Sequence, residues 1–468
     1  MKLPPQLQHF LNSPQLQQAL AVIVGLLLAT GLLGTFIAGG SSDSEGSSNN
    51  GSSSGGKGTV TATASTTPSA SESSSAPASA SSSSSQSTSE PKASRAKLEA
   101  RAKLSATYMA EGPASGKDTK AANGQNPPYS GQVIPGFSGV QEIGDGTFYG
   151  LPDNGFGAKG NSSDFLLRIY TVKPNWETAD NAANPENVGG IEVVNFIQLK
   201  DPKNKVPWEI VNKDDANRPL TGADFDLESF WVAEDGSFWI GEEFGPYILH
   251  FAKDGTLLEA PYAHPSVKSQ SNPTLLGEEK ANLRNSKGFE AMASDGRYLY
   301  PIFEGYIDGA QNKKQRVISQ FDMQTKQYTD KTWTYLTEDD DSLIGDAFLT
   351  KDGTLLVLER DDELGAKAKL KKIYAVKNFG DSTPTGEVKK EEHVDLLNIA
   401  NPGKIGMVSD KGAYGVADPF SFALRSVETI IQLKDGRYLT ALDNNFPGDD
   451  GRYSGKPDDT EIIIYSVK

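Results

Sequence analysis

The chain of 468 residues is acidic and contains no cysteine, which excludes several kinds of partner and site. Its 61 Asp and Glu outnumber its 45 Lys and Arg, and the formal net charge is -16. A negative surplus of this size opposes binding to nucleic acid or to an anionic membrane surface, and it suits bound cations. Without cysteine, the chain has no disulfide, thiolate metal site, cysteine nucleophile or lipoprotein anchor.

The first residues predict a membrane anchor. Residues 19–38, ALAVIVGLLLATGLLGTFIA, carry no charge and are long enough to cross a bilayer as a helix. A cleavable signal segment is the alternative, and the protein would then be secreted. Lys2 precedes the segment and two acidic residues follow it, so we expect residues 1–18 in the cytoplasm and the remainder in the periplasm or at the cell surface.

Residues 39–110 are predicted to be a disordered linker rich in Ser, Gly and Ala. Up to about residue 91 the segment has too few apolar side chains to offset the entropy that folding would cost. A basic stretch, KASRAKLEARAK at residues 92–103, then predicts a solvated helix, with contact to anionic lipid or cell wall as the alternative. The folded domain is accordingly predicted to span residues 111–468.

A phrase of similar length recurs along the folded part and indicates its architecture. Each copy has two alternating strands joined by an Asp-Gly turn, a strong hairpin signal because the turn needs positive φ. We therefore interpret the aspartates of these turns as turn residues. The copies are GFSGVQEIGDGTFYGLPDN from 136, DLESFWVAEDGSFWIGEEFG from 226, GFEAMASDGRYLYPIFEG from 288, IGDAFLTKDGTLLVLERDD from 344 and SVETIIQLKDGRYLTALDNN from 426.

Further strands follow most copies, which predicts an all-β protein with a single β-propeller of five or six four-stranded blades. The number of blades is five or six because the gaps 154–226 and 361–426 have room for a sixth blade or for long loops. The last copy stops after its third strand at the C-terminus. We expect its outer strand to come from the segment before Gly136, with residues 130–134 as the candidate.

Several separated phrases in the chain resemble the phytase-like family, also called esterase-like activity of phytase. They are GFSGV, DLESFWVAEDGSFWIGEEFGPYILHF, NSKGFEAMA and LLVLERDD. The resemblance extends over residues 130–468. It implies a β-propeller, and the family's name implies hydrolysis of esters or phosphoesters. The motifs by which propeller phytases bind calcium and substrate phosphates are not recognisable in this chain.

In a propeller, the first strand of every blade lines the central channel, so residues at equivalent positions converge. The start of the first strand and the end of the second both carry an acidic residue in most copies. The first set is Ser138, Glu228, Glu290, Asp346 and Glu428, and the second is Asp153, Glu242 with Glu243, Glu304, Glu359 with Asp361, and Asp443.

Two interpretations of these acids remain open. In the first, each acid accepts hydrogen bonds from backbone N–H groups or pairs with a basic neighbour. In the second, several converge on a divalent cation, with calcium favoured because it takes six to eight oxygen ligands in loose geometry. The expected ligands are Glu228, Glu290, Asp346 and Glu428.

If the domain is an enzyme, the sequence predicts cation-assisted hydrolysis of a small ester or phosphoester. Glu243 or Glu304 is the candidate to take a proton from water, and Lys287 and Arg360 are the candidates to hold an anionic substrate group. The chain has four histidines and no G-x-S-x-G elbow, which disfavours a Ser-His-Asp esterase and a zinc or copper site. The alternative is a non-enzymatic propeller at the cell surface that binds a protein or glycan, with calcium structural or absent.

Overall fold

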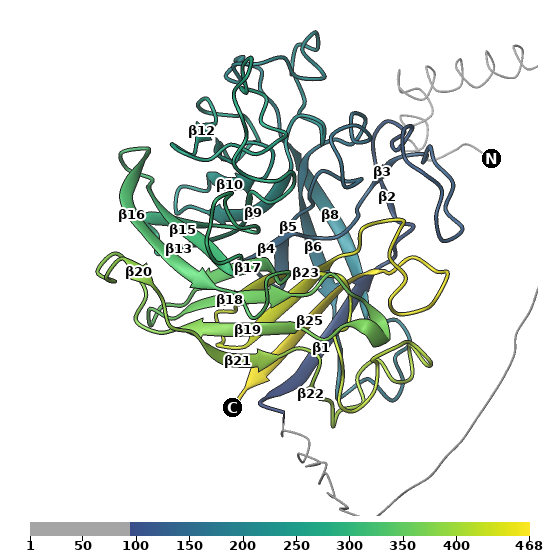
Figure 1. Cartoon of the computed structure of the whole chain (residues 1–468). Helices are drawn as coiled ribbons and strands as arrows, with labels where there is room; N and C mark the ends of the chain where they lie inside the picture. The colour runs from purple at the N-terminus through teal and green to yellow at the C-terminus, as the bar shows by residue number, and fades with distance from the viewer. Residues whose placement is uncertain (1–93) are drawn as a thin grey trace, which may run out of the picture. The chain divides into compact units, whose positions relative to one another are not determined.

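The computed structural model describes residues 94–468, and almost all of its regular structure is β-strand (Figure 1). The one helical element among these residues is a short 3₁₀ turn, η1 (Gly365–Lys367). Within this part of the chain no helix is long and apolar enough to cross a membrane. The predictions for residues 1–18, 19–38 and 39–93 lie outside the described residues.

The strands form five antiparallel blades, described here from the inner to the outer strand. Blade 1 consists of β4 (Gly139–Gly144), β5 (Thr147–Leu151), β6 (Arg168–Asn175) and β8 (Gly190–Gln198). Blade 2 consists of β9 (Leu227–Val232), β10 (Phe238–Glu242), β11 (Tyr247–Phe251) and β12 (Tyr262–Ala263). Blade 3 consists of β13 (Phe289–Ser294), β14 (Tyr298–Phe303), β15 (Gln315–Asp322) and β16 (Gln327–Leu336).

Blade 4 consists of β17 (Leu343–Leu349), β18 (Leu355–Arg360), β19 (Lys371–Val376) and β21 (Glu391–Asp395). Blade 5 consists of β23 (Ser426–Gln432), β24 (Tyr438–Asp443), β25 (Thr460–Val467) and β1 (Ala96–Leu104). Two-residue strands extend the blade edges: β20 (Gly386–Glu387) pairs with β16, and β7 (Glu177–Thr178) and β22 (Ile399–Ala400) pair with β1. The last pair is β2 (Met109–Ala110) with β3 (Gln132–Val133).

The inner strands close into a ring. They contact one another in the order β4, β9, β13, β17 and β23, and β23 contacts β4 again. This arrangement confirms the predicted propeller and gives it five blades. Residues 94–468 contain no sixth four-stranded sheet, so the two wide gaps between repeats are loops with short strands at blade edges.

The Asp-Gly turns within the blades form as predicted. Asp145 and Gly146 both have positive φ, 51° and 75°, as a tight two-residue hairpin requires. In blade 2, Oδ1 of Asp235 accepts a hydrogen bond from the backbone N–H of Ser237 at 2.9 Å. Asp435 does the same for Arg437 in blade 5, at 3.0 Å. These aspartates stabilise their own turns and take no part in a site.

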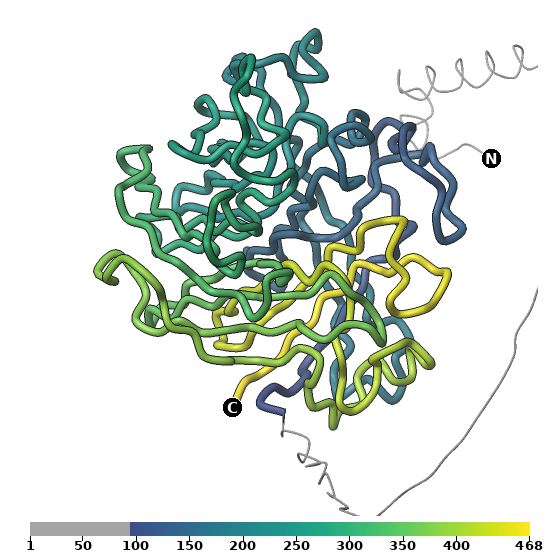
Figure 2. The backbone as a smooth tube through the Cα atoms, in the orientation of Figure 1, coloured from purple at the N-terminus to yellow at the C-terminus, as the bar shows by residue number. Residues whose placement is uncertain are grey.

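Blade 5 obtains its outer strand from the segment before the first repeat, but not from the stretch that we expected. Residues 130–134 overlap β3, whereas β1 pairs antiparallel with β25 along eight positions (Figures 1 and 2). The prediction that residues 94–110 belong to a disordered linker or a solvated helix is therefore wrong. The apolar residues Ala96, Leu98, Ala100, Ala102 and Leu104 alternate with polar ones and are all buried, which is the period of a strand.

A buried ion network joins β1 to the last strand. The Arg101 guanidinium donates from Nε to Oε1 of Glu461 at 2.7 Å and from Nη2 to Oε2 at 3.0 Å. Arg452 also contacts Glu461, and Asp410 contacts Arg101. Burial alone would raise the pKa of Glu461, but the two arginines hold it well below its usual range. The network fixes the strand that closes the ring.

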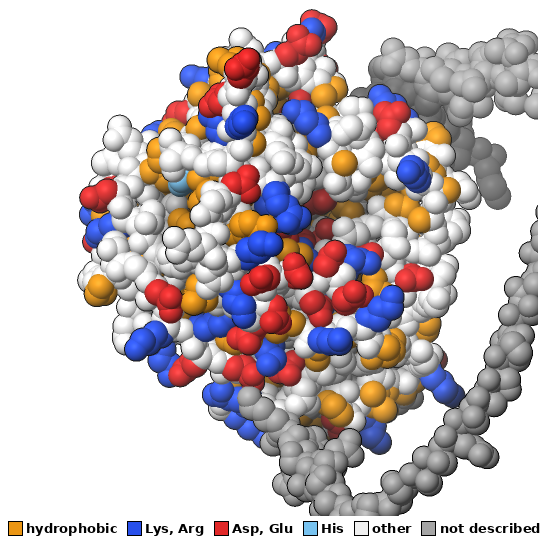
Figure 3. Space-filling view, in the orientation of Figure 1, with side chains coloured by type: hydrophobic (Ala, Val, Ile, Leu, Met, Phe, Trp, Pro, Cys, Tyr) orange, Lys and Arg blue, Asp and Glu red, His pale blue; other side chains and the backbone are white. Residues whose placement is uncertain are grey.

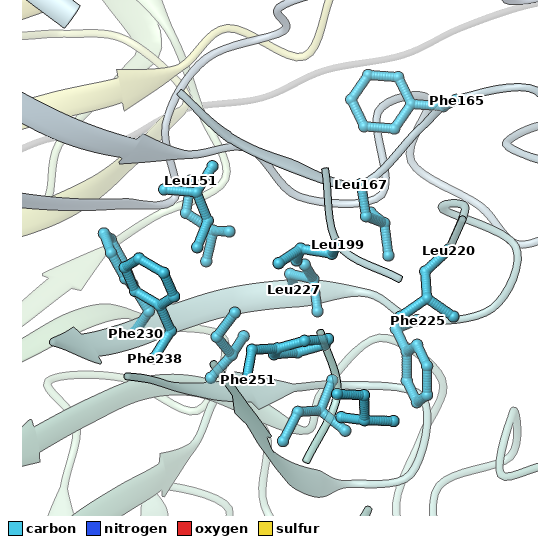
Figure 4. Packing of buried hydrophobic residues seen from close by; sticks show 14 of the residues in the cluster. Leu151, Phe165, Leu167, Leu199, Leu220, Phe225, Leu227, Phe230, Phe238 and Phe251 are labelled. Carbon is cyan, nitrogen blue, oxygen red and sulfur yellow. The ribbon is translucent and has the colours of Figure 1, made fainter. Parts of the chain in front are cut away.

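Apolar side chains fill the space between adjacent blades. Between blades 1 and 2, Leu151, Leu167 and Leu199 pack with Leu227 and Phe238 (Figure 4). Because each blade is apolar on both faces, the polar ends of its inner strands are the places left for a site.

Replacement of Arg101 by Met should destabilise the fold strongly, because Glu461 and Asp410 would lose a buried partner. Removal of one member of a buried pair costs about 3–5 kcal/mol. The matched control is Lys97→Met on the same strand, where the pair with Glu99 is partly exposed and is worth less than about 1 kcal/mol. Urea unfolding of both variants measures the difference, and equal losses would contradict a closing role for the network.

Candidate functional site

The acidic side chains meet at one end of the ring of inner strands. Each inner strand pairs antiparallel with the second strand of its blade, so the start of the first strand lies beside the end of the second. The pairs Leu227 with Glu242 and Ser426 with Asp443 show this register. Figure 3 shows acidic and basic side chains gathered around a recess on the face toward the viewer. Eight buried carboxylates form what we name the acidic cluster: Asp153, Asp226, Glu228, Glu243, Glu290, Glu304, Glu428 and Asp443.

β-Bulges aim three of these carboxylates. In blade 2 the strand register passes from Leu227 to Ser229 and leaves Glu228 as the extra residue. The same irregularity leaves Glu290 unpaired in blade 3 and Glu428 unpaired in blade 5. A bulge bends its strand and redirects the side chain of the extra residue. Repetition of the bulge therefore brings acids from distant segments to one place.

Two groups within the acidic cluster are close enough to hold a cation. One carboxylate oxygen each from Glu228, Glu243 and Glu290 lie within 4.8 Å of one another, and the same is true of Asp153, Asp226 and Glu228. The exposed fractions of these side chains run from 2% for Asp226 to 9% for Asp153. Oε1 of Glu243 and Oε1 of Glu290 are buried without a hydrogen-bond partner among the described residues. Buried carboxylate oxygens of this kind are the ligands that Ca²⁺ and Mg²⁺ prefer.

Two basic side chains occupy the other side of the acidic cluster. Nη2 of Arg360 lies 2.8 Å from Oε1 of Glu428, 3.2 Å from Oε1 of Glu304 and 3.6 Å from Oε1 of Glu290. Lys287 pairs with Oε2 of Glu304. Arg360 is itself buried, and the carboxylates that surround it neutralise its charge. Positive charge thus neutralises one half of the cluster and leaves the other half acidic.

Burial and mutual repulsion disfavour ionisation of the carboxylates in the two candidate cation groups. Burial first, and then the neighbouring carboxylates, raise the pKa values of Glu228, Glu243 and Glu290 well above the usual range. Burial and Asp226 raise the pKa of Asp153 to about 8. Burial raises the pKa of Asp226 to about 6, although Asn154 donates a 2.6 Å hydrogen bond to its carboxylate. At neutral pH such a group retains protons unless cations replace them.

Asp346 does not join the candidate ligands, which corrects the sequence prediction. Its oxygens accept hydrogen bonds from the backbone N–H groups of Ala347 at 2.7 Å and Ile430 at 2.8 Å. The register shift in blade 4 leaves Gly345, not Asp346, at the bulge position. The phrase IGDAFL is therefore offset by one residue from LESF, FEAM and VETI, and blade 4 contributes no carboxylate from its inner strand at that place.

Two acids at the ends of second strands are also structural. Glu242 accepts hydrogen bonds from the backbone N–H groups of Phe244 at 3.0 Å and Gly245 at 2.7 Å. Burial nevertheless raises its pKa to about 8. Glu359 accepts hydrogen bonds from the Tyr335 hydroxyl and from the backbone N–H of Glu338, and it pairs with Lys390. The first interpretation, in which acids satisfy backbone donors, describes Asp346, Glu242 and Glu359.

Asp226 is a member of the site that the sequence reasoning missed. It stands just before β9, at the first letter of the phrase DLESF, and the other four copies have no acid at that letter. The sequence pattern indicates Asp153 only as one of the repeated acids at the ends of second strands. No local sequence signal marks Asp226, because the amide of Asn154 reaches it from the neighbouring blade.

A cleft opens beside Lys287. Its volume is about 280 Å³, and its charged lining is mixed: the basic side chains are Arg284, Lys287 and Lys313, and the acidic ones are Asp340, Asp341 and Asp362. Arg316 also lines it but donates all of its hydrogen bonds to backbone carbonyls, among them that of Glu304. Lys287 therefore stands between an open cleft lined by both basic and acidic side chains and the buried acidic cluster.

Comparison with known proteins gives one curated relative and several solved structures of low similarity. An uncharacterized secreted protein of Arthroderma benhamiae is 26% identical over 112 residues, and the match covers 19% of this chain and 22% of that protein. The chain thus matches about a fifth of the relative's length.

The solved structures share little sequence with the chain. A GH43 β-1,3-galactosidase has a TM-score of 0.35 and 13% identity over 74% of this chain and 94% of its own. A structural genomics protein of unknown function from Bacteroides thetaiotaomicron has a TM-score of 0.33 and 11% identity, and covers 79% and 76%. Similarities at this level carry no information about activity.

The family match covers far more of the molecule than the curated relative does. Residues 132–446, well over half of the chain, match the family described as phytase-like, esterase-like activity of phytase. The matched segment contains the inner strands of all five blades and every member of the acidic cluster. On this ground the chain belongs to the phytase-like family.

Proposed function

We propose that the protein is an extracytoplasmic hydrolase of esters or phosphoesters that depends on a divalent cation, calcium being favoured. The observation that carries the proposal is the group of Glu228, Glu243 and Glu290, in which two buried carboxylate oxygens have no hydrogen-bond partner within residues 94–468. Carboxylates buried together are costly to ionise, and a hard cation offsets that cost. Glu428, expected as a ligand, is assigned instead to charge pairing with Arg360.

The residues around the cation position have separable roles in this proposal. When bound, the cation would polarise a substrate oxygen and make a bound water more acidic. Glu304 is the acceptor for the water proton, because Lys287 and Arg360 hold its carboxylate in a fixed orientation beside Glu290. Glu243, the other expected acceptor, becomes a ligand.

An anionic substrate group would enter through the cleft beside Lys287. Arg360 was expected to hold that group, but its Nη2 is already shared by three carboxylates. Lys287, at the edge of the cleft, is the better placed of the two. A small ester or phosphoester fits the size of this cleft, and Arg284 and Lys313 lie in its wall together with Lys287.

The location outside the cytoplasm rests on two supports. The curated relative is named a secreted protein, and residues 19–38 of the sequence are apolar and uncharged. Anchoring to a membrane by this segment stays a prediction, as does secretion after its cleavage.

A non-enzymatic role is the second candidate. The three carboxylates of the proposed ligand group are between 3% and 7% exposed, and a cation so deeply enclosed could serve only to hold the blades together. The domain would then bind a protein or glycan at the cell surface. The two experiments below separate these functions.

The stability of the cation-free protein should fall between pH 4 and pH 8. Carboxyls whose folded pKa is raised bind more protons in the folded state than in the unfolded state. Their contribution is complete below about pH 4 and is lost as the pH rises through the values of about 6 for Asp226 and about 8 for Asp153 and Glu242. Calcium should therefore raise the melting temperature more at pH 8 than at pH 5.

Differential scanning calorimetry with chelator or CaCl₂ makes this measurement. Glu290→Gln should lose the increment that calcium produces, whereas KCl at matched ionic strength should produce none. A melting temperature that neither calcium, magnesium nor chelator changes at pH 8 would refute a cation site.

Hydrolysis of aryl esters and aryl phosphates tests the enzymatic proposal. Glu304→Gln should retain the calcium-dependent stabilisation and lose turnover by about 10²–10⁴-fold, as expected for removal of a general base. Glu209→Gln is the matched control, because Glu209 is exposed and forms its salt bridge with Lys213, outside the cluster. Calcium stabilisation without any turnover in the unmodified protein would favour the binding protein instead.

A further inference from the structure

The two candidate cation groups share one side chain. Glu228 belongs both to the group with Glu243 and Glu290 and to the group with Asp153 and Asp226. We infer that the acidic cluster holds two divalent cations, bridged by Glu228, with Asp153 and Asp226 completing the second position. The inference rests on the proposed function, which requires only the first position. The ligand class is a hard divalent cation, calcium or magnesium.

The second position is built from two loop ends that meet across a blade boundary. Asp153 follows β5 of blade 1, and Asp226 precedes β9 of blade 2. The backbone N–H of Gly155 donates to Oδ1 of Asp153 at 2.8 Å, and Asn154 donates to Oδ1 of Asp226 at 2.6 Å. Each carboxylate is thus oriented by a neutral donor, and neither has an arginine or lysine salt bridge among the described residues. A neutral orienting donor leaves the negative charge available to a cation.

The balance of charge in the acidic cluster favours two cations over one. Its eight carboxylates face two basic side chains, Arg360 and Lys287, so the ionised cluster has an excess of six negative charges. One divalent cation would leave an excess of four, and two would leave an excess of two. Like charges buried together repel strongly, so the remaining excess decides how easily the cluster ionises.

Unpartnered polar atoms point to ligands independently of the acid count. In the described part of the chain, Oε1 of Glu243 and Oε1 of Glu290 have no hydrogen-bond partner, although Arg360 lies 3.6 Å from the latter, and both side chains are more than nine-tenths buried. The hydroxyl of Ser138 is also buried without a hydrogen-bond partner among these residues. In the sequence repeat Ser138 occupies the position that Glu228 occupies in blade 2, and its neighbour Gly139 lies close to the Phe230 ring of β9. The two carboxylate oxygens without a hydrogen-bond partner belong to the group that contains the shared Glu228.

A shared carboxylate has a consequence that mutation can test. Loss of Glu228 should therefore weaken both positions, whereas loss of Asp226 should weaken only one. This difference separates a bridged pair from two independent sites and from a single site.

The experiment is isothermal titration calorimetry of the full chain in detergent, freed of metal with chelator and titrated with CaCl₂ and with MgCl₂. We expect two equivalents for the unmodified protein with at least one of the cations. Asp226→Asn and Asp153→Asn should each bind one equivalent, and Glu228→Gln should show at least tenfold weaker binding at both positions. Glu234→Gln, an exposed acid near the turn of the same blade, should still bind two.

Each other outcome is decisive. One equivalent in the unmodified protein that Glu290→Gln abolishes and Asp226→Asn leaves unchanged would overturn the second position while the proposed function stands. Two equivalents that persist in both aspartate variants would overturn the assignment of Asp153 and Asp226. The absence of binding by either cation would overturn the inference and the proposed function together. The stoichiometry of the unmodified protein decides the main point even if a variant does not fold.

Discussion

Closure of the ring is the constraint on which the remainder of the structure depends. The first described strand, β1, completes the blade that the last strand, β25, leaves unfinished, and the buried pair of Arg101 with Glu461 fixes the two together. A ring that did not close would leave β23 without its contact to β4. Members of the acidic cluster come from blades 1, 2, 3 and 5, so only the closed ring holds them within a few ångströms of one another.

The site also depends on a local irregularity that regular strands would not provide. Side chains of an ideal strand alternate between two faces, and in a blade both faces pack against neighbouring blades. An extra residue at the start of the inner strand escapes that alternation, and in three blades this residue is Glu228, Glu290 or Glu428. The alternating residues of each strand pack the blades together, and the extra residue at the bulge brings charge to the channel mouth. The two roles are compatible because different residues have them.

Repetition explains how much of this was predictable from the sequence. The five copies and their Asp-Gly turns predicted a propeller of five or six blades, since turn chemistry and period-two alternation are local properties. β1 was missed because its polar positions are basic, which suggested a solvated segment, although Ala96, Leu98 and Ala100 alternate with them. Asp346 was misassigned because a one-residue offset within a repeat changes which side chain occupies the bulge. Asp226 was missed because its contact with Asn154 crosses between blades, and such contacts leave no local pattern.

The pairing of β1 with β25 places the two ends of the described domain next to each other. The backbone N–H of Lys468 donates to the carbonyl of Arg95 at 3.0 Å. A short peptide could span that distance, and new termini could be opened in an exposed loop between any two blades. The order in which the blades follow one another along the chain is thus separable from their order around the axis, so that circular permutants would preserve the same propeller.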